Sequence, residues 1–263
     1  MATVQLSDAE SLESVITYGA PHCESRGVAR GSLFHPDGYS LWRVLGELDA
    51  NAELEWGTEH GDEALFVLNG TLECGGERVL KGSGIIVEAG VATVVAFHEL
   101  TELVHFGPIA TTPPTAGLLG PAADEGRGVH LVSEADAPSI RFRGPNGGTA
   151  TYFGDGSCPT CRINFFLIDG SAFGDGFSAP SHLHSEDEII HVLDGELQVG
   201  RHTVLPGTSI AVPGSLRYSF RTAGPFRYLN YRADASTILS RPGSEPRLET
   251  VASMNSGQVE GPE

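Results

Sequence analysis

Cysteine is scarce in this chain, and its scarcity excludes one class of protein. The 263 residues include 4 cysteines, too few and too scattered for the disulfide framework of a small secreted domain. Only Cys158 and Cys161 are closely spaced, in the order Cys-Pro-Thr-Cys. A single Cys-x-x-Cys without a second pair is a weak zinc signal, and no strand-to-helix pattern beside it favours a redox role. We therefore expect these two cysteines to be structural or incidental, in a reducing compartment.

Basic residues are also in short supply. Lysine and arginine total 16 against 34 aspartates and glutamates, which gives a formal net charge of −18, and no basic cluster interrupts the acidic field. Such a charge repels phosphate backbones and anionic lipids, so nucleic acids and membranes are poor partners. The first 15 residues are acidic where a secretory signal is basic and apolar, and no run approaches the length of a membrane span. We expect a soluble, cytoplasmic protein whose partner is a small molecule.

Long stretches with helical periodicity are few, whereas turn-forming residues are common. The 34 glycines and 16 prolines favour many short strands joined by tight turns over a helical bundle. A chain of this length suits two domains, each with its own core. The composition predicts an all-β protein with few short helices. One helix is expected near residues 8–17, where Ser7 and Glu10 match a capping box.

An internal repeat determines the expected architecture. An offset of 125 residues aligns the two halves of the chain without a gap. Matches this dense in one ungapped window indicate a duplication. The matched pairs are Glu63 with Glu188, Val67 with Val192, Leu68 with Leu193, Gly70 with Gly195, Leu72 with Leu197, Gly75 with Gly200, Val79 with Val204, Leu80 with Leu205, Gly82 with Gly207, Ile85 with Ile210 and Val87 with Val212.

The sequence of each copy of the repeat predicts a set of hairpins that close into a barrel. Asn69-Gly70 and Asp194-Gly195 lie between apolar runs, and an Asx-Gly pair in that setting is a strong hairpin signal. The expected segments are an N-terminal segment at 1–30, a first barrel at 31–110, a linker at 111–130, a second barrel at 131–235 and a C-terminal tail at 236–263.

The sharpest feature of the second copy is the run Gly176-x5-His182-x-His184-x3-Glu188-x6-Gly195. Residues two apart on an extended segment point to the same face, so both histidines can enter a barrel interior. The glutamate begins the next strand and can point inward too. Two imidazoles and one carboxylate form the facial triad of non-haem iron sites and the donor set of some zinc sites. We predict that His182, His184 and Glu188 bind a divalent metal ion.

This run resembles the first signature motif of the cupin superfamily and matches it at every defined position. The family's second signature continues with a glycine, a proline, a second glycine and a fourth histidine ligand. Gly207 and Pro213 match it, but Ser215 and Tyr218 replace the second glycine and the histidine. The resemblance implies a jelly-roll barrel, also called a double-stranded β-helix, with a metal site inside.

The resemblance covers about residues 40–105 and 160–232, which makes the chain similar to bicupins, proteins with two tandem cupin barrels. The two copies differ at the ligand positions. Gly57 and Glu59 stand where the second copy has its histidines, and Glu63 alone keeps the carboxylate. Because one carboxylate cannot hold a metal usefully, we predict that the first barrel has lost its metal site.

Tyr218 stands at the position of the fourth ligand. A phenol has an ordinary pKa near 10, so it binds an ion only after losing a proton, whereas histidine binds as the neutral base. We expect Tyr218 to be the catalytic residue, donating a hydrogen bond or relaying a proton beside the metal, with simple filling of the barrel as the alternative. The other histidines of the two copies are expected to be surface or packing residues outside the ligand shell: His98, His105, His191 and His202.

Three protein ligands on an octahedral ion leave about three positions for a substrate and dioxygen. The resemblance to cupin dioxygenases therefore implies a non-haem Fe(II) dioxygenase acting on a small chelating substrate. The second hypothesis is a redox-neutral isomerase, decarboxylase or lyase that uses Zn, Mn or Ni. The third is a non-catalytic binding or sensing module. A homodimer is compatible with the exposed edges of such barrels. The substrate stays open, with these side chains expected near the barrel mouth: Phe165, Phe166, Phe220, Tyr228 and Asn230.

Overall fold

The structure, a computed structural model, describes residues 3–7, 17–113, 117–142 and 147–251. These residues divide into two compact units. The unit that we call the first barrel takes in residues 10–137 and 159–161, and the second barrel takes in residues 1–9, 138–158 and 162–263. The helix expected near residues 8–17 falls on residues 8–16, which lie outside the described part of the chain. Within that part, no helix is long and apolar enough to cross a membrane.

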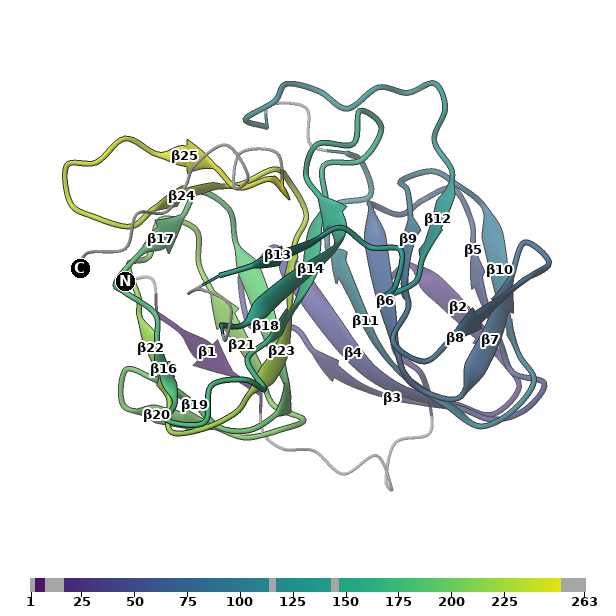
Figure 1. Ribbon diagram of the computed structural model, residues 1–263. Helices are drawn as coiled ribbons and strands as arrows, with labels where there is room; N and C mark the ends of the chain where they lie inside the picture. Colours follow the sequence, from purple (N-terminus) through teal and green to yellow (C-terminus); the bar gives the residue numbers. More distant parts are fainter. Residues whose placement is uncertain (1–2, 8–16, 114–116, 143–146, 252–263) are drawn as a thin grey trace. The chain divides into compact units, whose positions relative to one another are not determined.

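The first barrel is made of two antiparallel sheets (Figure 1). One sheet has the order β2-β5-β10-β7-β8 and the other β12-β9-β6-β11-β4-β3. The strands are β2 (Cys23–Arg26), β3 (Ala29–Phe34), β4 (Leu41–Leu48), β5 (Glu53–Trp56), β6 (Glu63–Asn69), β7 (Thr71–Cys74), β8 (Glu77–Leu80), β9 (Gly84–Val87), β10 (Thr93–Phe97), β11 (Thr101–Pro108) and β12 (Val129–Val132).

The second barrel has a larger sheet of order β1-β21-β18-β23-β15-β14-β13 and two smaller sheets, β16-β22-β19-β20 and β17-β24-β25. The predicted all-β class, with two barrels of antiparallel strands, is thereby confirmed for the described residues. The strands are β1 (Gln5–Leu6), β13 (Ser139–Arg141), β14 (Thr149–Asp155), β15 (Asn164–Asp169), β16 (Phe177–Ser178), β17 (Leu183–His184), β18 (Glu188–Asp194), β19 (Leu197–Val199), β20 (His202–Val204), β21 (Ser209–Val212), β22 (Phe220–Thr222), β23 (Arg227–Arg232), β24 (Thr237–Leu239) and β25 (Arg247–Leu248).

The two barrels repeat the same strand pairing in the same register. In the first barrel Glu63 is opposite Val87, across β6 and β9. In the second barrel Glu188 is opposite Val212, across β18 and β21. Each of these residues is shifted by the same 125 positions that align the sequence. Since a slip of one residue would turn every side chain to the other face, the shared register places Glu63 and Glu188 at equivalent points of the two interiors.

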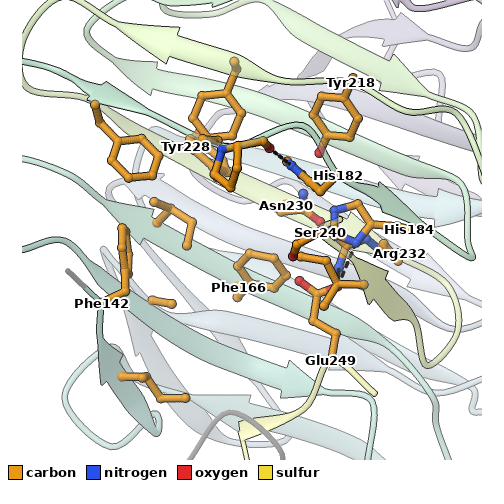
Figure 2. A pocket seen from close by; sticks show the side chains of 18 of the residues that line it. Phe142, Phe166, His182, His184, Tyr218, Tyr228, Asn230, Arg232, Ser240 and Glu249 are labelled. Carbon is orange, nitrogen blue, oxygen red and sulfur yellow. Dashed lines mark hydrogen bonds and ion pairs between the residues drawn. The ribbon is translucent and has the colours of Figure 1, made fainter. Parts of the chain in front are cut away.

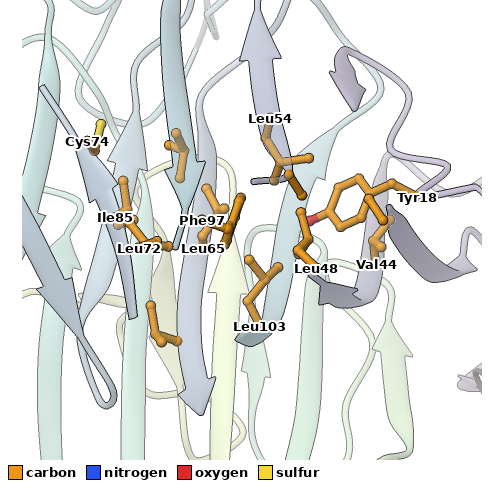
Figure 3. Packing of buried hydrophobic residues seen from close by; sticks show 14 of the residues in the cluster. Tyr18, Val44, Leu48, Leu54, Leu65, Leu72, Cys74, Ile85, Phe97 and Leu103 are labelled. Carbon is orange, nitrogen blue, oxygen red and sulfur yellow. The ribbon is translucent and has the colours of Figure 1, made fainter. Parts of the chain in front are cut away.

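The core of the first barrel is formed by side chains from both of its sheets (Figure 3). Leu65 and Ile85 come from one sheet, and Leu72 and Phe97 come from the other; all four are fully buried. Burial of each such side chain stabilises the fold by about 1.5–3 kcal/mol. The alternation of inward apolar residues along the strands is therefore what closes this barrel.

Segments outside the barrels expected from the sequence take part in the sheets. The predicted tail at 236–263 carries β24 and β25, and β24 pairs with β17. Glu249 follows β25 and is buried, with 4% of its surface exposed. At the other end of the chain, β1 pairs with β21. The tail therefore brings a carboxylate into the interior of the second barrel.

The hairpin glycines at equivalent positions adopt the left-handed conformation in both copies. Gly70 has φ of +81° and Gly195 has φ of +75°. A Cβ atom added at Gly70 would lie 2.5 Å from the Leu100 carbonyl oxygen, and one added at Gly195 would clash with the Pro225 carbonyl oxygen. These turns require glycine both for its conformation and for the close approach of the neighbouring backbone.

Alanine at either position should destabilise its barrel more than alanine at a glycine with open space. Gly75 and Gly200 also have positive φ, but nothing lies within 4 Å of an added Cβ. We expect Gly75→Ala and Gly200→Ala to cost about 1 kcal/mol of unfolding free energy, the conformational part alone. Gly70→Ala and Gly195→Ala should cost clearly more. Chemical denaturation of the four variants measures the difference, and equal losses would show that the backbone contacts at the hairpins do not matter.

Candidate functional site

The three predicted metal ligands reach the second barrel from adjoining segments. His182 forms an isolated antiparallel bridge with Tyr218, and the backbones of these two residues exchange hydrogen bonds of 2.9 Å. His184 ends β17 and Glu188 begins β18. His182, His184 and Tyr218 line one cavity, with the two imidazoles close to one another (Figure 2). Their ring centroids are 5.0 Å apart.

The hydrogen bond made by His182 determines which of its nitrogens faces the cavity. Nδ1 lies 2.7 Å from the carbonyl oxygen of Pro180. A carbonyl oxygen only accepts, so Nδ1 carries the proton and Nε2 keeps its lone pair. Burial lowers the pKa of His182, which favours this neutral form. The Nε2 atom of His182 can therefore donate its lone pair to a metal ion.

His184 is held in the same way by a carboxylate. Its Nδ1 lies 2.9 Å from Oε2 of Glu249, so Nε2 is the ring nitrogen that is left to face Glu188. That Nε2 lies 3.9 Å from Oε1 of Glu188. A histidine that ligates a metal usually donates its other ring N–H to a carboxylate or a backbone carbonyl. Both histidines of this site show that pattern.

Glu188 is fully buried and held by three donors. Nη2 of Arg232 and Nδ2 of Asn230 each lie 2.7 Å from its Oε2, and the Tyr218 hydroxyl also donates to the carboxylate. Burial raises the pKa of Glu188, but its electrostatic interactions with His184 and Arg232 and its hydrogen bonds together outweigh burial and lower the pKa to about 2. Glu188 is therefore an anion in a fixed orientation.

Arg232 and Glu249 are site residues that the sequence interpretation missed. Arg232 has 1% of its surface exposed, and its Nη1 lies 2.7 Å from Oε2 of Glu249. The guanidinium thus bridges two buried carboxylates, Glu188 and Glu249. A signal for Arg232 was present, because it closes the apolar strand β23, where an arginine at a buried position needs a charged partner. Nothing in the sequence near Glu249 distinguished it from the other acidic residues, which are expected at the surface.

The cavity is small and mostly apolar, with its polar groups at one end (Figure 2). Its volume is about 220 Å³. Glu188 is not among the lining side chains, but it accepts hydrogen bonds from two that are, Arg232 and Asn230. The lining residues are Ile140, Phe142, Ala150, Tyr152, Phe166, Ile168, Phe177, Ala179, Pro180, His182, His184, Tyr218, Phe220, Tyr228, Asn230, Arg232, Ile238, Ser240 and Glu249.

Four of the five side chains expected near the barrel mouth do line this cavity, and the fifth does not. Phe165 points to the other face of β15, where its ring packs against Phe153 and Tyr231 at centroid distances of 5.3 and 6.4 Å. Its neighbour Phe166 faces the cavity. The alternation of a strand allows only one of two successive residues to face inward, so the expectation for Phe165 is corrected.

Tyr218 lies against both predicted imidazole ligands. Its ring centroid is 4.5 Å from that of His182 and 6.1 Å from that of His184. Burial and the nearby Glu188 carboxylate raise its pKa well above the ordinary value of 10. The phenol therefore keeps its proton at neutral pH and can donate it in a hydrogen bond. This agrees with a role beside the ligands rather than as an anionic ligand, although the role itself stays a prediction.

The equivalent point of the first barrel is occupied by a cluster of aromatic and polar side chains. Glu63 Oε2 lies 2.7 Å from Nε1 of Trp56 and 2.8 Å from Nε2 of His105. His105 is 42 residues from Glu63, as Asn230 is from Glu188, so the same hydrogen bond recurs in both copies. Gly107 stands at the position of Arg232, and a Cβ there would clash with Trp42. Packing therefore fills the space that faces Glu63.

The remaining histidines named from the sequence have ordinary partners. His191 bonds Oγ of Ser209 at 2.9 Å and is buried on the outer face of β18, as the strand alternation predicts. His98 lies 3.2 Å from Glu73 at the surface, and His202 is exposed. His105 is a packing residue as expected, but its contact with Glu63 places it at the centre of the first barrel.

Comparison with known proteins finds structural relatives only. No family model matches the chain, and no curated protein matches it. A candidate glyoxylate-induced protein of Pseudomonas aeruginosa is 15% identical over 93% of either chain, with a TM-score of 0.64. The oxalate decarboxylase OxdC of Bacillus subtilis, in a mutant form, is 13% identical over 88% of this chain and 78% of that one, with a TM-score of 0.60. A candidate dioxygenase of Nostoc punctiforme is 13% identical over 92% and 88%, with a TM-score of 0.58.

Proposed function

Starting from a chain that has the fold of two tandem cupin barrels, we propose that the second barrel is a metal-dependent enzyme. In this proposal His182, His184 and Glu188 hold one divalent ion, and the adjoining cavity takes a small organic substrate. The observation that carries the proposal is the orientation of the two imidazoles. Each places Nδ1 beside an acceptor, a carbonyl at 2.7 Å or a carboxylate at 2.9 Å, and so presents Nε2 as the nitrogen that would bind a metal.

The residues present fit a divalent ion in distance and in charge. Two ligands at about 2.0–2.2 Å from a shared ion lie roughly 3–4 Å apart, and His184 Nε2 is 3.9 Å from Glu188 Oε1. Glu188 and Glu249 carry two negative charges against one positive charge on Arg232. The buried cluster therefore has an excess negative charge that a cation would neutralise.

We propose oxygen chemistry with Fe(II) as the reaction. When bound, Fe(II) would supply the electron transfer that couples an organic substrate to dioxygen. Three protein ligands would leave room on the ion for both reactants. The cavity wall, with Phe142, Phe166 and Tyr228, is apolar and suits a flat or aliphatic substrate that chelates through adjacent oxygens.

Tyr218 and Arg232 have separate tasks in this proposal. Tyr218 keeps its hydroxyl proton because its pKa is raised. The hydroxyl now donates to Glu188, and on substrate binding it would turn this donor to a substrate oxygen instead. Arg232 keeps Glu188 and Glu249 in place through two hydrogen bonds of 2.7 Å. Arg232 is therefore a positioning residue, and Tyr218 is the candidate catalytic residue.

A redox-neutral reaction with Mn, Zn or Ni is the second candidate. The observation that favours it is the protonated phenol of Tyr218 at the ligand end of the cavity, which suits proton delivery to a carbanion or enolate. An oxalate decarboxylase among the similar structures adds to this candidate. The fold alone does not select between the two reactions.

Oxygen uptake by protein loaded with one metal at a time separates these functions. The substrates for the panel are diketones, catechols and flavonols. Oxygen consumption that requires Fe(II) supports the dioxygenase. Substrate loss without oxygen consumption, under Mn, Zn or Ni, supports the redox-neutral enzyme. Tight binding without turnover of any ligand would overturn the enzymatic proposal in favour of a binding module.

Glu249→Gln tests the support behind His184. Glutamine can still accept the Nδ1–H of His184, but the negative charge that strengthens this imidazole as a ligand is lost. We expect metal affinity to fall by about 10-fold to 100-fold, with the ligands themselves unchanged. Titration with Mn(II), followed by electron paramagnetic resonance of the free ion, measures the change. A metal affinity equal to that of the unmodified protein would show that Glu249 acts only as the ion-pair partner of Arg232.

A further inference from the structure

The Cys-Pro-Thr-Cys segment has two further metal-binding side chains beside it in the folded chain. Sγ of Cys158, Sγ of Cys161, one imidazole nitrogen of His130 and a carboxylate oxygen of Glu88 all lie within 4.8 Å of one another. The sequence offered only a weak zinc signal, because no second ligand pair was visible. The fold supplies that pair from residues far away in the chain. We propose that these four residues bind one zinc ion.

Strand pairing fixes the two distant ligands next to each other. Glu88 directly follows β9, His130 lies on β12, and these two strands pair antiparallel. Nε2 of His130 lies 2.7 Å from Oε1 of Glu88. The backbone N–H of Gly128 donates to the other oxygen, Oε2, at 2.7 Å. The carboxylate and the imidazole are therefore held by the sheet in one orientation.

The cysteine segment is anchored to the same place by two hydrogen bonds. Oγ1 of Thr160 donates to Oε1 of Glu88 at 2.6 Å, and the carbonyl oxygen of Pro159 accepts from the N–H of Ala123 at 2.8 Å. Cys161 directly follows this anchored pair, and Cys158 directly precedes it. The short chain connection therefore fixes both sulfur atoms near Glu88.

The donor set and its burial suit zinc. Thiolate and imidazole are the ligands that zinc prefers, and its tetrahedral sites place ligand atoms roughly 3–4 Å apart; the four donor atoms here all lie within 4.8 Å of one another. Glu88 is fully buried and Cys161 is 2% exposed. Zinc would take the place of the proton that His130 and Glu88 share. Four protein ligands leave no open position, so the site would be structural.

Cobalt substitution and zinc analysis test this site directly. One zinc per chain is expected after purification, and replacement by Co(II) should give thiolate charge-transfer bands with the strong visible bands of tetrahedral cobalt. Cys161→Ser and His130→Ala should lose the zinc and these bands. Cys23→Ser, which changes a cysteine on β2 outside the cluster, should keep both, and so should Glu188→Gln in the second barrel. Equal zinc content in Cys161→Ser and Cys23→Ser would overturn the proposal.

Alkylation of the unmodified protein gives a second measurement that does not depend on the variants' folding. Zinc should protect Cys158 and Cys161 from iodoacetamide by at least about 10-fold, and a chelator should remove the protection. Mass spectrometry of the peptide containing residues 158–161 reports it. Equal alkylation with and without zinc, or a disulfide between the two cysteines in freshly purified protein, would contradict the site.

Discussion

Glu188→Gln is expected to remove the divalent ion from the second barrel, weakening its binding by more than about 100-fold. The substitution keeps the size of the side chain and an oxygen that can accept from Arg232 and Asn230, which now donate to Oε2. It removes the charge opposite His184, whose Nε2 is 3.9 Å from the carboxylate. Equilibrium dialysis with Mn(II) or with anaerobic Fe(II) measures the loss.

Glu63→Gln in the first barrel is the matched control. Glu63 occupies the same register position as Glu188, but its neighbours are Trp56 and His105 rather than two inward histidines. We expect its metal affinity to equal that of the unmodified protein, with circular dichroism confirming that both variants fold. If both variants lose the ion, or both keep it, the assignment of the ligands is wrong.

Arg232→Leu should destabilise the second barrel by about 3–5 kcal/mol, the loss found when one partner of a buried ion pair is removed. Glu188 and Glu249 would be left as two buried carboxylates without the cation that now bridges them. Thermal unfolding without added metal measures the effect, because a bound divalent ion would replace part of the lost charge. Added Mn(II) should therefore restore part of the stability.

The double variant Arg232→Leu with Glu249→Gln isolates the cause of that loss. Removing one of the two carboxylate charges should recover part of the stability lost in Arg232→Leu. If the double variant is no more stable than the single one, loss of packing by the arginine stem explains the effect, and the charge argument fails.

The architecture was predictable because the duplication preserved local signals. Gly70 and Gly195 begin equivalent turns with the same left-handed φ, and the strands that flank them keep one register in both copies. A period of two residues also allowed His182 and His184 to be assigned to one face. These predictions depend on a few neighbouring residues, which a sequence displays directly.

The outer part of the site was not predictable in the same way. Glu249 reaches the cavity through the pairing of β24 with β17, and the sequence of the predicted tail shows only a polar, acidic segment. Arg232 is explained only once both of its carboxylate partners are known. The cluster at Cys158 and Cys161 depends on the pairing of β9 with β12. In each case a contact between residues far apart in the chain decides the chemistry, and no local pattern encodes it.

Anomalous diffraction from crystals grown with Mn(II) or anaerobic Fe(II) tests the central claim most directly. We predict one peak at the metal's absorption edge within about 2.0–2.3 Å of Nε2 of His182, Nε2 of His184 and a carboxylate oxygen of Glu188. A second barrel with no peak at these three residues, in crystals soaked at millimolar metal, would contradict it.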